Sequence, residues 1–180
     1  MAAHDRRVRL GAIVALVVLA GFVAWLIFKS DDNKANAPAR APAAAVSYSQ
    51  LQSLPGQVGH DVYWTGKKTG YTYELTRTSQ GNIFVRYLPA SAKVGDPRSN
   101  FLTVGTYPSR NAYADLKKVA AKPDSVSRQL AGGGIAVYSK QRPASVYAAY
   151  PKKGLQVEVY DPSPARARQL VFSGQVRPLR

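Results

Sequence analysis

The sequence of 180 residues contains no cysteine. This absence excludes disulfide bonds, thiol catalysis, cysteine-ligated zinc and anchoring through an acylated cysteine. Domains without disulfides occur on either side of a membrane, so the lack of cysteine leaves the compartment open.

Acidic residues are also scarce, because the chain has 10 Asp and Glu against 25 Lys and Arg, a formal net charge of +15. Residues 46–180 alone hold 19 basic and 7 acidic residues. Such an excess predicts attraction to polyanions: nucleic acid, anionic lipid headgroups or acidic envelope polymers. The alternative interpretation is that the charge only keeps a solvated surface soluble.

Catalytic motifs are missing as well, since the sequence has no nucleophile elbow, S-x-x-K, H-E-x-x-H or P-loop pattern. We therefore predict no catalytic residue, no metal site and no cofactor. His60 precedes Asp61 and is interpreted as a loop residue. Glu74 and Glu158 are expected on the solvated outer faces of strands rather than as a glycosidase pair. Residues 132–134, three glycines before a predicted strand, indicate a hairpin turn rather than a phosphate cradle.

One long apolar run stands out against these absences. Leu10 to Phe28 contains nineteen residues without a charge. As a helix it measures about 28 Å, close to the thickness of the hydrocarbon core of a bilayer. Its Leu, Ile, Val and Phe residues contribute about −5 kcal/mol to insertion. The run predicts a single-pass transmembrane helix and hence a cell-membrane location.

The flanks of this run suggest a signal anchor. Residues 1–9 form a short tail with three arginines, and the run is longer than the apolar core of a cleavable signal peptide. We favour an uncleaved anchor at 10–28 with the N-terminus inside and the rest of the chain outside. Residues 29–46 are rich in Ala and Pro and predict an extended linker.

Residues 47–180 read as one α+β domain, with a mostly antiparallel sheet of about six or seven strands and two packed helices. One helix is expected to begin with Ser109 as its N-cap, and the other with Ser163 as its N-cap and Pro164 in its first turn. Tyr48 to Leu54 suggests only a short helical turn that Pro55 ends. Strands are expected at 61–65, 71–76, 83–88, 101–106, 125–130, 135–139, 145–150 and 155–160.

Aromatic and basic residues are interspersed in the sequence of this domain. This combination suits the binding of single-stranded nucleic acid, sugars or anionic polymers. Tyrosines are also good strand residues and lysines good turn residues, which is the simpler explanation. If a binding surface exists, we expect it at the two Lys-Lys turns and nearby aromatics: Trp64, Lys67, Lys68, Tyr71, Tyr150, Lys152 and Lys153.

Two segments carry a family resemblance: Val62-Tyr63-Trp64-Thr65-Gly66, and Asp161 to Ala167 with the sequence DPSPARA. They resemble uncharacterised membrane-anchored proteins of high-GC Gram-positive bacteria, a family of unknown function. The resemblance implies an extracytoplasmic domain anchored in the cell membrane, and it implies no catalytic residue.

These observations favour a non-enzymatic binding or structural module of the cell envelope, with an anionic polymer or a membrane protein as its partner. One alternative is a basic domain that faces the cytoplasm and holds nucleic acid at the membrane, which requires the opposite topology. A second alternative is an envelope enzyme without a recognised motif.

Overall fold

The structure is a computed structural model that describes residues 42–180. The predicted anchor Leu10 to Phe28, the basic tail and most of the linker lie outside the described residues. Across 42–180, no helix has both the length and the apolar character needed to cross a membrane.

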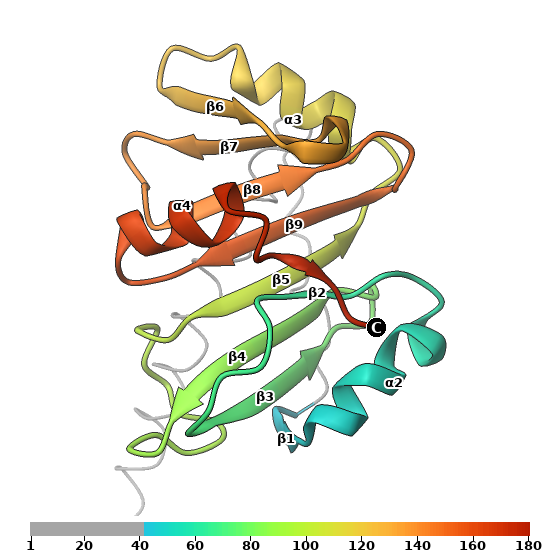
Figure 1. Ribbon diagram of the computed structural model, residues 1–180, viewed down its shortest axis with the longest axis vertical. Helices are drawn as coiled ribbons and strands as arrows, with labels where there is room; N and C mark the ends of the chain where they lie inside the picture. The colour runs from blue at the N-terminus through green and yellow to red at the C-terminus, as the bar shows by residue number, and fades with distance from the viewer. Residues whose placement is uncertain (1–41) are drawn as a thin grey trace, which may run out of the picture.

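Eight strands form one antiparallel sheet in the order β1-β3-β4-β5-β9-β8-β7-β6 (Figure 1). The domain is therefore α+β, as predicted, with eight strands in place of six or seven. The strands are β1 (Ala44–Val46), β3 (Tyr71–Arg77), β4 (Ile83–Pro89), β5 (Thr103–Pro108), β6 (Ser125–Gln129), β7 (Ile135–Ser139), β8 (Ser145–Ala149) and β9 (Leu155–Tyr160).

Two consecutive meanders build this sheet, β3-β4-β5 and β6-β7-β8-β9, and they join where β5 pairs with β9. Local turn chemistry explains the hairpins. The turn between β8 and β9 places Lys152 at φ 62° and Gly154 at φ 61°, a conformation that favours glycine. The glycines at 132–134 lie in the hairpin that joins β6 to β7, which confirms the predicted turn.

Three helices pack on the sheet: α2 (Tyr48–Val58), α3 (Ala112–Ala120) and α4 (Pro164–Phe172). The start of α4 is confirmed, since the Ser163 hydroxyl accepts a hydrogen bond from the Arg166 amide and Pro164 opens the helix. The predicted N-cap of α3 is wrong, because that helix begins three residues after Ser109, at Ala112.

The third helix, α2, corrects a further prediction. A capping box between Ser47 and Gln50 starts it. It does not end at Pro55 but continues to Val58, and Gly59 ends it in the left-handed conformation at φ 73°. Pro55 lacks one amide donor, and the burial of two leucines on this helix, Leu51 and Leu54, offsets that loss.

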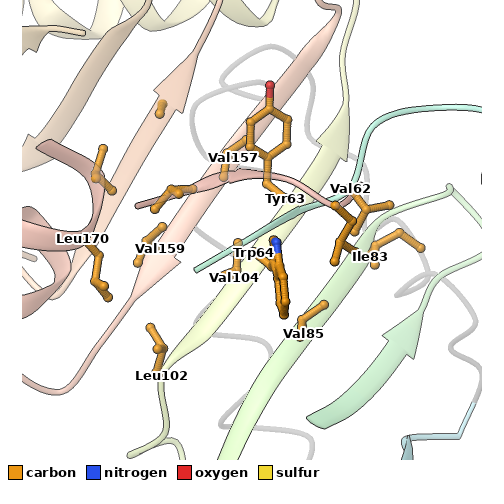
Figure 2. Packing of buried hydrophobic residues seen from close by; sticks show 14 of the residues in the cluster. Val62, Tyr63, Trp64, Ile83, Val85, Leu102, Val104, Val157, Val159 and Leu170 are labelled. Atoms are coloured by element: carbon orange, nitrogen blue, oxygen red, sulfur yellow. The ribbon is translucent and has the colours of Figure 1, made fainter. Parts of the chain in front are cut away.

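The two faces of the sheet are covered by different elements. The larger core lies between the sheet and α2, α4 and two short strands, β2 (Tyr63–Trp64) and β10 (Arg177–Pro178). Figure 2 shows Trp64 of β2 beside Val85 and Val104, two valines of β4 and β5. A smaller core lies on the opposite face under α3.

Two segments differ from the predicted strands. The strand expected at 61–65 shortens to β2, which pairs with β10 in a separate two-stranded sheet rather than joining the main one. Residues 44–46, which the composition assigns to the linker, add β1 to the sheet edge beside β3. Both pairings join distant parts of the chain, so local sequence patterns do not indicate them.

Candidate functional site

The first predicted Lys-Lys turn leads into β3 and lies against aromatic rings. The Lys68 Nζ lies 3.8 Å from the centre of the Tyr71 ring, and the Lys67 Nζ lies 5.8 Å from the centre of the Tyr48 ring. Trp64 is only 4% exposed, with its ring stacked on Tyr48 at 5.3 Å. Trp64 is therefore part of the core and offers no open face to a ligand.

The second Lys-Lys turn joins β8 to β9. The Lys153 Nζ forms an ion pair with the Asp61 carboxylate at 3.1 Å, while Lys152 is exposed. Tyr150 is half-buried, and its ring lies parallel to that of Tyr63 with 6.3 Å between centres. Burial, with the nearby Asp61 charge, raises the pKa of Tyr63 to about 12, and burial also raises the pKa of Tyr150, so both rings are neutral at physiological pH.

The seven predicted residues thus form two groups rather than one surface. Trp64 lies on β2, and Lys67, Lys68 and Tyr71 belong to the segment that leads from β2 into β3 (Figure 1). The other three lie at the turn between β8 and β9, at the right of the sheet (Figure 1).

Glu74 and Glu158 are not on solvated faces, which corrects the prediction made for both. Their exposed fractions are 1% and 2%. The alternation along β3 and β9 is regular, but both faces of the sheet are covered. The segment 90–101 folds over β3 and β4, and α3 covers the β7 and β8 side. A polar residue at an alternate strand position is therefore buried here.

Glu74 is neutralised by a cation. The Arg86 Nη1 lies 2.5 Å from the Glu74 Oε1, and the Gly95 amide donates a hydrogen bond of 2.6 Å to Oε2. The Arg86 Nη2 also donates to the backbone carbonyls of Asp96 and Arg98, at 3.1 and 2.8 Å. This buried ion pair therefore holds the segment 90–101 on the sheet.

Glu158 is surrounded by neutral hydroxyl groups instead. It accepts hydrogen bonds from Tyr107 at 2.6 Å, Ser145 at 2.8 Å and Tyr147 at 3.0 Å. Burial raises the pKa of Glu158, although the three hydroxyl donors act in the opposite direction. Burial and the neighbouring Glu158 together raise the pKa of Tyr147 well above its ordinary value.

A glycine makes room for one of these bonds. A Cβ atom at Gly105 would lie 2.8 Å from the Tyr107 Cε2 and Oη, so the tyrosine ring occupies the place of the missing side chain.

Gln156 lies two residues before Glu158 and is 5% exposed. Its Nε2 is the one buried side-chain N or O atom of the described residues without a hydrogen-bond partner.

The two glutamates do not form a pair. They lie on strands β3 and β9, which are three strands apart in the sheet. At about 4.8 Å per strand this separation is about 14 Å between backbones, larger than the separation in glycosidase pairs. Each carboxylate also has its own set of partners.

The structure also places His60 and the acidic residue beside it. No group of three His, Cys, Asp or Glu residues among residues 42–180 could hold a metal ion. The His60 Nδ1 lies 2.8 Å from the backbone carbonyl of Asp61, while the Asp61 carboxylate pairs with Lys153. His60 is therefore a loop residue without a carboxylate to orient it.

The structure also shows a surface that the sequence analysis missed. The Arg128 guanidinium of β6 lies over the Phe172 ring with 4.9 Å to its centre, and the Arg168 guanidinium of α4 lies over the Tyr138 ring at 5.2 Å. We call these four residues the arginine–aromatic surface. The spacing of Arg168 and Phe172, four residues apart on a helix, is the signal in the sequence.

No protein-family model, curated protein or solved structure matches this chain. The resemblance to the envelope proteins therefore stays a prediction.

Proposed function

We propose that this protein is a single-pass membrane-anchored module of the cell envelope that binds an anionic polymer through the basic surface of its domain. It acts by binding and not by catalysis. The predicted anchor at Leu10 to Phe28 holds the module at the membrane, and residues 29–46 give it reach.

One observation carries the proposal, namely how the seven carboxylates of residues 46–180 are used. Five are in ion pairs: those of Asp61, Glu74, Asp96, Asp115 and Asp161. The other two bond to neutral groups, since Asp124 accepts from the Gln141 amide and Glu158 from hydroxyls. These ion pairs engage five of 19 basic side chains, so the domain carries a cationic surface that internal acids do not balance.

The location of the buried acids supports binding rather than catalysis. Glu74 and Glu158 are the two most buried carboxylates, and each is enclosed by partners from its own domain. A general acid or base needs to reach a substrate proton, and neither group is placed on an accessible surface.

A binding comparison tests the proposal. The full chain in neutral detergent is titrated with purified anionic wall polymer, with anionic lipid vesicles and with single-stranded DNA, at about 50 and about 150 mM salt. We expect binding to the wall polymer to persist at the higher salt. Equal binding to all three that disappears at the higher salt would overturn the proposal.

The topology has its own test. In intact cells, added protease should digest the domain if it lies outside the membrane. Protection of the domain, together with salt-resistant binding of DNA, would instead support the cytoplasm-facing alternative.

A further inference from the structure

We infer that the domain binds the polymer at the arginine–aromatic surface, and that the repeating charged group of this polymer is a phosphodiester. The inference rests on the proposed function and adds the site and the ligand class. It moves the binding surface away from the two Lys-Lys turns.

This surface combines two guanidinium groups with two aromatic rings. Arg168 and Phe172 are four residues apart on α4, a rise of about 6 Å. Their partners Tyr138 and Arg128 come from the neighbouring strands β7 and β6. Each pair therefore joins one residue of α4 to one residue of the strands β6 and β7.

Stacking prepares each guanidinium for an anion. Each guanidinium carbon lies about 5 Å from the centre of a ring, and the N–H groups directed away from that ring can donate two parallel hydrogen bonds to phosphate oxygens. The contact also restricts the long side chain, so less entropy is lost on binding. Among residues 42–180, neither Arg128 nor Arg168 is in an ion pair with a carboxylate.

The location suits an extended ligand. β6 is the last strand of the sheet, and Arg128 on it is exposed, while the other three members are half-buried. Two cationic positions on one surface allow successive charges of one polymer to bind together, which increases the apparent affinity. At the Lys-Lys turns, by contrast, Lys153 is already paired with Asp61, and a lysine ammonium lacks the planar pair of N–H donors that a guanidinium offers to phosphate.

The test compares two double variants that remove the same charge. The full chain in neutral detergent is titrated with poly(glycerol phosphate) at near-physiological salt. Arg128→Ala with Arg168→Ala is expected to weaken binding at least about tenfold, and Lys152→Ala with Lys153→Ala at most about threefold. Thermal melting of each variant checks that the domain still folds.

Two further measurements separate a built site from mere charge. Arg128→Lys with Arg168→Lys keeps both charges and most of the packing, and we expect it to lose about as much affinity as the alanine variant. Poly-L-glutamate, a repeating carboxylate, is expected to bind more weakly than poly(glycerol phosphate).

Several results would overturn the inference. Equal losses in the two alanine variants, full affinity in the lysine variant, or tighter binding of poly-L-glutamate would each contradict it, with polymer binding by the wild type left intact. If the wild-type protein binds neither polymer at near-physiological salt, the proposed function fails as well. The two failures are therefore distinguishable.

Discussion

Glu74 and Glu158 lie on the same face of one sheet and are almost equally buried, at 1% and 2% exposed, but their surroundings differ. Glu74 has a buried arginine and a backbone amide as partners. Glu158 has two tyrosines and a serine. One site compensates a charge with an opposite charge, and the other with hydroxyl dipoles.

This difference shows that strand position alone does not decide how an acid behaves. The hydroxyl site lets its carboxyl titrate, because protonation removes the cost of burying the charge, and the pKa of Glu158 is accordingly raised. At the other site both charges are needed, since removal of one partner leaves the other buried and uncompensated. The two sites should therefore respond differently to mutation and to pH.

The largest effect is expected from Arg86→Met. It leaves the Glu74 carboxylate buried without a cation and should lower the free energy of unfolding by about 3–5 kcal/mol. Chemical unfolding of the full chain in detergent, followed by near-ultraviolet circular dichroism, measures this loss. The double variant Glu74→Leu with Arg86→Met should be clearly more stable than Arg86→Met. A loss below about 1 kcal/mol in the single variant would show that the ion pair is not required.

A smaller effect is expected at the hydroxyl site from Gly105→Ala. The new Cβ would lie 2.8 Å from ring atoms of Tyr107, whose hydroxyl is held by Glu158, so the ring cannot move without loss of that bond. We expect a loss of about 1–3 kcal/mol, as for an overpacked core. The same substitution combined with Tyr107→Ala tests the mechanism. If the two losses simply add, the clash is not with Tyr107.

The next prediction concerns pH. Because the folded-state pKa of Glu158 is raised, the folded protein binds more protons than the unfolded chain above pH 4.5. The stability from this group is complete below pH 4.5 and is lost as pH rises through the raised pKa. The slope is at most about 1.4 kcal/mol per pH unit. Glu158→Gln should lack this loss, so melting curves of both proteins from pH 4 to 8 should diverge. Parallel curves would contradict the prediction.

Sequence patterns predicted much of this fold because many of its signals are local. The Ser163 cap with Pro164 predicted the start of α4, and alternation predicted β3 and β4. The burial of Glu74 was not predictable from such signals, because its cover comes from residues 90–101. A regular period of two is the same whether one face of a sheet is buried or both.

The candidate site shows the same limit. Arg168 and Phe172 are visible as neighbours on one helix, but their partners Tyr138 and Arg128 lie 30 and 44 residues earlier in the chain. The sequence analysis predicted binding residues at the two Lys-Lys turns because adjacent cations can be recognised in the sequence itself. Arg86 and Arg98 also lie over a ring, that of Phe101, but both are paired with carboxylates. Which arginines have a ring and which have an acid as partner depends on tertiary contacts.

The smallest expected effect is at Asp96, on the segment that covers Glu74. Hydrogen bonds from Arg98 lower the pKa of Asp96 to about 2. A group with a lowered pKa contributes stability above its ordinary value of 3.8, and this contribution is lost as pH falls through about 2. Asp96→Asn should therefore lower the melting temperature slightly at pH 6, less than Gly105→Ala does, and the difference from wild type should shrink toward pH 2. Arg98→Gln is the matched control, because it removes the same pair from the other side. A difference that stays constant with pH would mean that the Asp96 carboxylate does not help to hold the cover on Glu74, and that the backbone groups bonded to Arg86 and Glu74 are enough to hold it.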